Sequence, residues 1–428
     1  MANFNNYLPQ GASYELRSER IKSSNVSFEN NRFERIDSND RATQTVRLLH
    51  NGKLSTAASS KPNSAEELIK QASETVRYGS PHDVQFVGKS DVAKLNLVDD
   101  TQMSPKEMIE VIGEFVSELK KLDERLTVAA SLTSTETEIS LKTSNGFDHS
   151  YRKTVWSCGG SLALAQGQDL LRLLRSRVAM GPNFDLKKFK EDIAWTLENA
   201  KNTAAFKAGA YPVIFTPREM GNIINPIIAS LNGQAIHRKV SPWSDKLGQV
   251  LLDERFTLID DGGVDNSWTS RPFDLEGTPT KRNALVQNGR IQDVITDRKS
   301  AAQLGRESNG NAQAMNAAPN YLQIDAGGKS LDELIKSIDY GMIIDGTMGA
   351  WSGNPYTGIV TGTISMGLKI ENGKIAGRVK DSMFTINAFN HLRDHLIDCS
   401  TEREQLPQRG APGLFPYMLL DEVVISTK

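Results

Sequence analysis

Asn-Gly pairs recur along this chain, and they constrain its fold more than any other feature. Asn51-Gly52, Asn288-Gly289 and Asn372-Gly373 stand between segments in which apolar and polar residues alternate, and Asn145-Gly146 separates two longer segments. Asn-Gly favours type I′ turns because both residues accept a positive φ, while alternation places every second side chain on one face of a strand. The chain is therefore expected to contain many antiparallel hairpins.

The first half mixes such strands with helices. Residues 13–57 are expected to form a four-stranded antiparallel meander, with bends at Asn30-Asn31 and within 37–40. Two of the helices open with Ser followed three residues later by Glu, the pattern of a capping box at Ser64 and at Ser104. The expected helices cover 64–76, 104–119 and 184–202, and further strands are expected at 127–143 and 148–166. This order is typical of an α+β domain.

The second half consists mostly of short strands, with helices expected at 216–231, 330–339 and 381–398. Many short strands separated by Gly, Asn and Asp turns are typical of a sandwich or barrel. We place the domain boundary near 206–210, where a charged helix gives way to an apolar strand. The predicted class is α+β, with a mixed N-terminal domain over 1–205 and a strand-rich sandwich or barrel-like domain over 206–428.

Composition narrows the functional classes. The chain has 428 residues, too many for one ordinary core, and its formal net charge of −2 provides no overall positive field for nucleic acid. The two cysteines, Cys158 and Cys399, lack CxxC spacing and are expected to be reduced thiols. The sequence shows neither a secretory signal nor a membrane span, so we expect a cytoplasmic protein.

The stretch FDLEGTPTKRNALVQNG carries two carboxylates, Asp274 and Glu276, at i and i+2. In an extended segment they face the same side, where they could share a proton, hold a metal or accept backbone N–H groups at a bend. The following Gly277 to Lys281 turn lacks the spacing of a phosphate-binding loop, and Pro279 removes a donor. We favour a structural role for the two acids.

Other candidates are weaker. Arg282 could contact a carboxylate of a substrate or lie on the surface, and Trp351 could line a groove or pack. The polar loops at 303–313 and 351–362 could line a site or simply turn the chain, and the first is long enough to cover a groove. His391 and His395 share a helix face with Cys399 nearby, but no Glu completes a zinc-binding HExxH motif.

Several segments together resemble one known family, in matching order along nearly the whole chain. They are YELRSERIKSSNVSFENNRFERI, FKAGAYPVIFTP, KLGQVLLDERFTLIDDG, FDLEGTPTKRNALVQNGRI, TGTISMGLKIENGKIAGRV and APGLFPYMLLDEVVIS. The chain is identified on these as a member of the TldD/TldE family, also called the PmbA or modulator of DNA gyrase family. The resemblance implies dimers of a zinc metallopeptidase that cuts unfolded peptides, with zinc held by a His-Glu-x-x-x-His helix in the TldD-type subunit.

This sequence departs from that motif. The corresponding stretch, TPREMGNIINPIIASLNG, contains Glu219 but no histidine, and Asn222 and Asn225 stand near where imidazoles are needed. Neutral Asn is a poor zinc ligand. The resemblance therefore implies a TldE/PmbA-type subunit with no catalytic residue and no cofactor of its own, paired with a TldD-type chain or with itself.

In this interpretation an unfolded peptide enters as an added strand, held by main-chain hydrogen bonds. Neither direct nucleic-acid contact nor a membrane is expected. The candidates for the peptide groove or its structural support are Asp274, Glu276, Thr278, Arg282, Asn309, Asn311, Trp351 and Thr361.

Two alternatives remain open. The chain could be a self-sufficient homodimeric metallopeptidase whose ligands have moved to His391, His395 and Cys399, or to His237. It could instead be a regulatory module that acts on a topoisomerase or another folded partner, as one family name implies.

Overall fold

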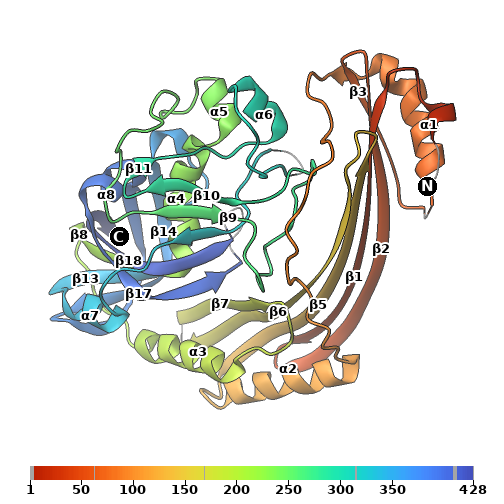
Figure 1. The fold of residues 1–428 in the computed structure, drawn as a ribbon. Helices are drawn as coiled ribbons and strands as arrows, with labels where there is room; N and C mark the ends of the chain where they lie inside the picture. The colour runs from red at the N-terminus through yellow and green to blue at the C-terminus, as the bar shows by residue number, and fades with distance from the viewer. Residues whose placement is uncertain (1–3, 62, 168, 314–315, 408–411, 428) are drawn as a thin grey trace.

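The computed structural model describes residues 4–61, 63–167, 169–313, 316–407 and 412–427. Two sheets organise the chain, one of seven strands and one of eleven. Figure 1 shows the seven-stranded sheet as a long curved layer, with the strand-rich second half packed on its concave side. Helices and antiparallel strands are mixed in the first half, which confirms the predicted α+β class.

The seven-stranded sheet is antiparallel throughout, in the order β4-β3-β2-β1-β5-β6-β7. Its strands are β1 (Ser13–Glu29), β2 (Arg32–His50), β3 (Lys53–Ser59), β4 (Ser80–Pro81), β5 (Leu126–Thr143), β6 (Asp148–Gln166) and β7 (Asp169–Ala179). The meander predicted over 13–57 therefore has three strands, and the expected fourth was wrong. The bend expected within 37–40 is absent because these residues pair with 22–25 of β1 and β2 continues through them.

Three helices belong to the first half: α1 (Ala65–Thr75), α2 (Pro105–Lys120) and α3 (Leu186–Ala200). The capping box of α2 is confirmed, since Ser104 and Glu107 exchange side-chain and backbone hydrogen bonds. The box expected at Ser64 was wrong. The backbone N–H and the hydroxyl of Ser64 both donate to Oε1 of Gln44 on β2, so Ser64 bonds to the sheet and does not cap α1.

The second half contains a closed barrel. Five strands follow one another in the order β18-β16-β14-β13-β8, and β8 then pairs again with β18. The other strands, β9 to β12, β15 and β17, continue the sheet outside this ring. The strands are β8 (Gly209–Phe215), β9 (Leu258–Asp261), β10 (Arg282–Gln287), β11 (Arg290–Ile291), β12 (Leu322–Ile324), β13 (Tyr340–Met348), β14 (Ile359–Glu371), β15 (Lys374–Val379), β16 (Ser382–Asn387), β17 (Leu396–Leu406) and β18 (Gly413–Thr427).

The helices of the second half are short: α4 (Met220–Ser230), α5 (Gly233–His237), α6 (Arg298–Gln303), α7 (Leu331–Lys336) and α8 (Ala388–Asp394). The single helix expected over 381–398 was wrong, because that stretch holds the whole of β16, then α8 and the start of β17. In β16 buried and exposed residues alternate, which is the period of a strand and not of a helix.

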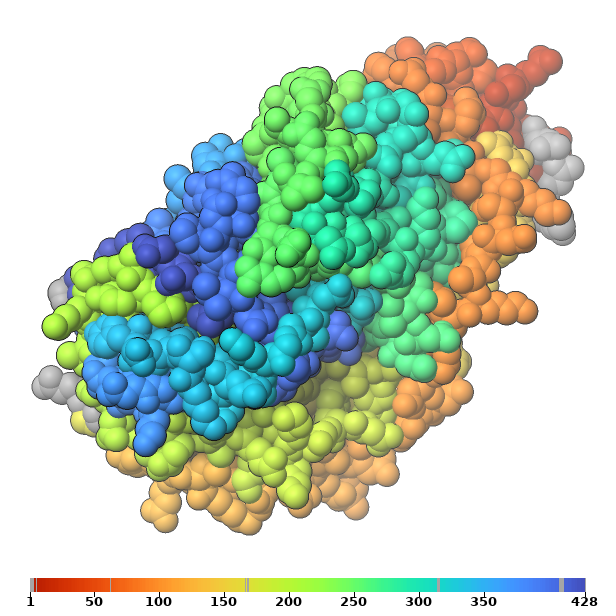
Figure 2. All heavy atoms as spheres, turned by 60° about the vertical axis from the view of Figure 1, so that its left-hand side comes forward, coloured from red at the N-terminus to blue at the C-terminus, as the bar shows by residue number. Residues whose placement is uncertain are grey.

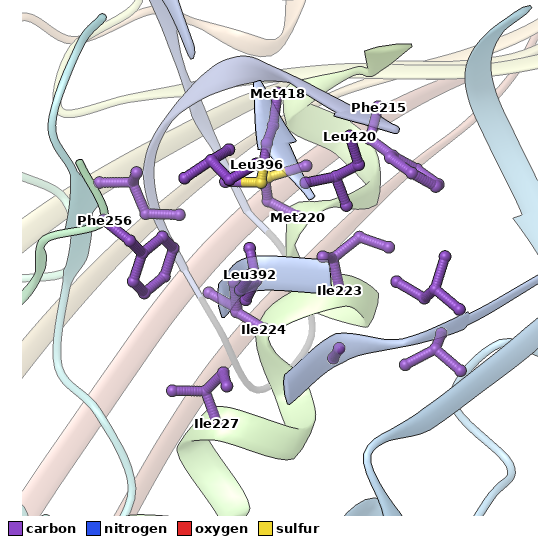
Figure 3. Close-up of a cluster of buried hydrophobic side chains, with 14 of the residues drawn as sticks. Phe215, Met220, Ile223, Ile224, Ile227, Phe256, Leu392, Leu396, Met418 and Leu420 are labelled. Atoms are coloured by element: carbon purple, nitrogen blue, oxygen red, sulfur yellow. The ribbon is translucent and has the colours of Figure 1, made fainter. Parts of the chain in front are cut away.

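Two apolar cores hold the structure together. One fills the barrel and its surroundings, where α4 directs Ile223, Ile224 and Ile227 toward side chains such as Leu392 and Met418 (Figure 3). The other is shared by both halves, because residues of α2, α3, β5 and β6 form one buried cluster with residues of β8, β13 and β14. In the space-filling view the green-to-blue second half lies directly on the yellow-green residues of β7 and α3 (Figure 2). The domain boundary near 206–210 stays a prediction.

No helix among the described residues is long and apolar enough to span a membrane. Both cysteines are free and buried, as expected for reduced thiols.

Candidate functional site

The stretch where the family places its zinc-binding helix begins directly after β8 and runs into α4. Glu219 is buried there, and its Oε2 accepts hydrogen bonds from Thr347 Oγ1 at 2.6 Å and from Asn222 Nδ2 at 3.0 Å. Burial raises the pKa of this carboxyl above its ordinary value. Asn225 is exposed on the helix surface. The only carboxylate of this stretch is thus occupied by two neutral donors.

These residues do not fit a zinc ion. Arg218 takes the position next to Glu219, and a guanidinium repels a metal cation. Arg218 Nη1 lies 3.1 Å from Asp345 Oδ1, so the nearby aspartate is neutralised as well. Among the described residues no group of three or more His, Cys, Asp or Glu side chains is placed to hold a metal.

A buried ion network joins the two sheets beside Glu219. Asp345 on β13 forms an ion pair with Arg175 on β7 in addition to Arg218, and both Arg175 and Asp345 are almost fully buried. Glu404 on β17 accepts a hydrogen bond from Tyr417 Oη at 2.6 Å and lies 3.7 Å from Arg218 Nη2. Of these residues only Arg175 comes from the first half, and its buried charge is paired with Asp345 of the second half.

This network forms one wall of a cavity of about 670 Å³ between the two halves. Strand β7 contributes Arg177 and Val178, α3 contributes Asp192 and Trp195, and β17 contributes residues 402–405. The buried hydroxyl of Thr216, at the end of β8, also lines the cavity and has no hydrogen-bond partner. A volume of this size could hold a few residues of an extended peptide.

Asp274 and Glu276, the two carboxylates predicted from the sequence, contact different partners. Asp274 Oδ1 accepts the backbone N–H groups of Glu276 and Thr278, both at 2.9 Å, and Oδ2 accepts the N–H of Ala312 at 2.9 Å. Glu276 Oε2 accepts the N–H of Arg298, the first residue of α6, at 2.8 Å. Asp274 therefore ties two loops together, and Glu276 ties the same bend to a helix.

Burial raises the pKa of both carboxyls, and that of Glu276 reaches about 7, because Arg298 and Arg47 offset the cost of burial only in part. Thr278 is buried, and its hydroxyl has no partner. Arg282 is exposed at the start of β10.

The remaining groove candidates divide into two groups. Asn309 is buried and holds both the N–H and the hydroxyl of Thr296, while Asn311 donates to Asp260 Oδ2 at 2.6 Å. Both belong to the loop that Asp274 holds through the N–H of Ala312, so they lie beside the bend of Asp274 and Glu276. Trp351 is 64% exposed, and Thr361 on β14 donates to the carbonyl of Phe384; among the described residues neither makes a hydrogen bond to that bend.

The alternative metal ligands do not converge either. His391 and His395 lie at the end of α8 with ring centroids 5.2 Å apart, and His391 Nδ1 contacts the carbonyl of Asn387 at 2.9 Å. Cys399 lies in β17, where it pairs with Met418. Burial raises the pKa of its thiol to about 12, far from the thiolate that zinc requires.

Residues that sequence reasoning missed include Arg175, Arg218 and Asp345. The sequence carried no signal for them, because Arg175 and Asp345 stand 170 positions apart and meet only when the two sheets dock.

Comparisons with known proteins agree with this fold. The model of the "PmbA/TldA metallopeptidase C-terminal domain" matches residues 208–427, and that of "PmbA/TldA metallopeptidase domain 1" matches 14–76. The metalloprotease PmbA of Escherichia coli O157:H7 is 23% identical over 411 residues, which cover 86% of this chain and 85% of that protein.

An uncharacterized protein of Methanocaldococcus jannaschii is 27% identical over 357 residues, which cover 76% of this chain and 82% of that protein. The crystal structure of TldE from Thermococcus kodakarensis matches with a TM-score of 0.91 at 22% identity and covers 99% of this chain and 98% of its own. At that identity the likeness shows a common fold, while the match to the C-terminal family model covers half of the chain. This chain therefore belongs to the PmbA/TldA metallopeptidase family.

Proposed function

We propose that this chain is the non-catalytic, TldE/PmbA-type subunit of a zinc metallopeptidase that processes unfolded peptides. Zinc and the reacting water belong to a TldD-type partner. The observation that carries the proposal is the state of Glu219. It is buried, hydrogen-bonded to Thr347 and Asn222, and next to an arginine, so it can neither bind zinc nor activate a water.

The chain's own contribution is a wall and a groove for the peptide. Strand β7 pairs only with β6, and β17 pairs only with β18, among the strands of the described residues. Strand β7 therefore presents an unpaired edge. The second edge of β17 makes backbone hydrogen bonds with residues 327–329 at Ser400 and Thr401, while its residues 402–405 line the cavity of about 670 Å³ together with β7. An extended peptide can add to such an edge through main-chain hydrogen bonds, which suits unfolded substrates of varied sequence.

The loops at 303–313 and 351–362 take a supporting part in this proposal. Asn309 and Asn311 hold the first loop to its neighbours, and the exposed Trp351 in the second is available to a partner chain or a peptide. We place the assembled dimer in the cytoplasm, where the two buried free thiols stay reduced.

The proposal is tested by purifying this chain alone and together with a TldD-type chain. Elemental analysis is expected to find zinc only in the pair, and only the pair should cleave a fluorogenic unfolded peptide. Zinc bound to the isolated chain at one ion per molecule, and retained through dialysis against a chelator, would contradict the proposal.

Glu219→Gln sharpens the test. The amide keeps an oxygen for Thr347 and Asn222, so cleavage by the pair should stay within about twofold of the unmodified pair. The matched control is the same Glu→Gln change in the metal-binding helix of the TldD-type partner. Loss of a general base there should lower cleavage by about a hundredfold or more. A comparable loss from Glu219→Gln would show that this chain is catalytic.

A further inference from the structure

A second cavity, of about 390 Å³, lies between β6, residues 268–271 and residues 318–320. It is separate from the groove between β7 and β17. Two cations, an indole and three prolines are among the residues that line it: Lys153, Arg271, Trp268, Pro319, Pro407 and Pro412.

The two cations of this cavity have no counter-ion. Among the described residues, no carboxylate oxygen lies within 4.0 Å of a charged nitrogen of Lys153 or Arg271. Lys153 Nζ donates to the carbonyl of Ser270 at 3.0 Å, and Arg271 Nε donates to Asn320 Oδ1 at 2.8 Å. Paired charges are the rule for cations that are withdrawn from water, so an Arg with no counter-ion, beside a Lys that burial leaves partly neutral near pH 7, is unusual.

The acids near Arg271 are already engaged. Asp260 accepts the N–H groups of Asn320 and Tyr321, and Asp274 accepts three backbone N–H groups. Both carboxylates influence Arg271 from a distance, but neither reaches it. The positive charge of this cavity is therefore not cancelled by the protein.

Two donors beside the cavity are shielded from solvent and lack a partner: the indole N–H of Trp268 and the hydroxyl of the fully buried Ser270, next to the carbonyl that holds Lys153. Trp268 therefore lines the cavity with its ring and not with its N–H. The cavity is partly open to solvent, and a guanidinium and an amine that line it can hold a small anion.

The charge state of Lys153 agrees with this picture. Burial and the charge of Arg271 lower the pKa of Lys153 to about 7. Tyr151 and Arg17 also act electrostatically on Arg271, and Arg17 itself forms an ion pair with Glu19. An anion in the cavity would relieve the repulsion between the two cations and return the proton to Lys153.

We propose that the cavity lined by Lys153, Trp268 and Arg271 is a binding site for the carboxylate of a peptide. Lys153 and Arg271 hold the carboxylate, and the ring of Trp268 and the prolines cover the carbon chain beside it. The apolar prolines favour an organic carboxylate over a fully hydrated inorganic ion. The inference deepens the proposed function, on which it rests, by naming a chemical group of the peptide that this subunit would bind.

The test measures the binding of a labelled unfolded peptide to the full chain by fluorescence anisotropy. The same peptide is used with a free C-terminal carboxylate, with a C-terminal amide, and with an internal Glu or Gln. One charge-assisted contact predicts about tenfold tighter binding of the form that carries the relevant carboxylate. The acid–amide pair and the Glu–Gln pair then tell the C-terminal from the side-chain source.

Lys153→Met should remove that preference, and Lys153→Arg should keep most of it. Lys142→Met is the matched control, because it removes one positive charge from the neighbouring strand β5 at an exposed lysine outside the cavity. Binding of the preferred peptide near pH 7.5 should also take up a proton, seen as a dependence of the calorimetric heat on the buffer.

Equal affinities for the acid and amide forms and for the Glu and Gln forms, with cleavage by the pair intact, would overturn the carboxylate site and leave the proposed function standing. Absence of cleavage by the pair, with the tenfold preference present, would refute the proposed function and leave the site standing. Competition by inorganic phosphate but not by acetate would overturn the assignment to a carboxylate.

Discussion

Replacing Asp274 by Ala should destabilise the protein strongly, although the residue lies far from any reacting group. The carboxylate accepts the N–H groups of Glu276, Thr278 and Ala312, each at 2.9 Å. Alanine leaves these donors without an acceptor, and two of the three bonds are buried. An unsatisfied buried donor costs about 1–3 kcal/mol, which gives a gross loss of about 4 kcal/mol.

Part of this loss is offset. Burial raises the pKa of Asp274, so the ionised carboxylate itself carries a desolvation cost that Asp274→Ala removes. We therefore expect a net decrease of about 3 kcal/mol in the free energy of unfolding. Asp274→Asn keeps one oxygen for Glu276 and Thr278 but turns an NH₂ group toward the N–H of Ala312, so it should cost about 1–2 kcal/mol.

Urea unfolding followed by circular dichroism measures these differences. The control is Asp37→Ala on β2, an exposed residue paired only with Arg35, which should change stability by less than about 1 kcal/mol. Hydrogen exchange should also show faster exchange of the amides of Thr278 and Ala312. A loss from Asp274→Ala no larger than that of the control, or one smaller than that of Asp274→Asn, would refute this reasoning.

Three further predictions concern other parts of the chain. The pKa of Glu276 is raised to about 7 in the folded state, so the folded protein loses stability as pH rises from about 4.5 to 7. Glu276→Gln should therefore stabilise the protein by about 1–3 kcal/mol at pH 8 and leave its stability unchanged at pH 4. Urea titrations at both pH values measure this difference. Asp345→Leu strips the buried Arg175 of its carboxylate and should lower the free energy of unfolding by about 3–5 kcal/mol by the same assay. His391→Ala combined with His395→Ala should leave zinc content and cleavage by the reconstituted pair unchanged, whereas loss of both would favour relocated ligands.

Local turn chemistry could be predicted from the sequence because it depends on neighbouring residues alone. Asn51, Asn288 and Asn372 all adopt positive φ between 49° and 50°, each followed by a glycine at φ 70° or 71°. Such pairs favour type I′ hairpins but do not always form them, since Asn145 before Gly146 does not adopt a positive φ and Asn232 before Gly233 caps α5. Together with the alternation around them they were enough to predict the α+β class and a barrel-like second half.

Elements that depend on distant partners could not be predicted in the same way. Residues 37–40 have the composition of a turn but form a strand, because 22–25 of β1 pair with them. Ser64 has the sequence of a helix cap but bonds to Gln44 on the neighbouring sheet. In both cases the sheet supplies hydrogen bonds that cannot be predicted from the turn or helix propensity of neighbouring residues.

The candidate sites show the same limit. Asp274 could be identified because an acid three residues before a Gly-Thr-Pro turn is a local pattern. The cavity of Lys153 and Arg271 could not, because these residues come from opposite halves and neither stands in a recognisable motif. A charged side chain can be identified as unpaired only when all of its neighbours in space are known.

The closure of the barrel has a consequence for biosynthesis. Strand β18, which pairs with β8, β12, β16 and β17, is made of residues 413–427, and all four partners precede it in the chain. Until β18 has been synthesised, β8 lacks one neighbour, and the apolar core shared by both halves lacks part of its cover. The barrel can therefore close only after β18 has emerged, and a premature stop before residue 413 would leave an aggregation-prone fragment with an open barrel.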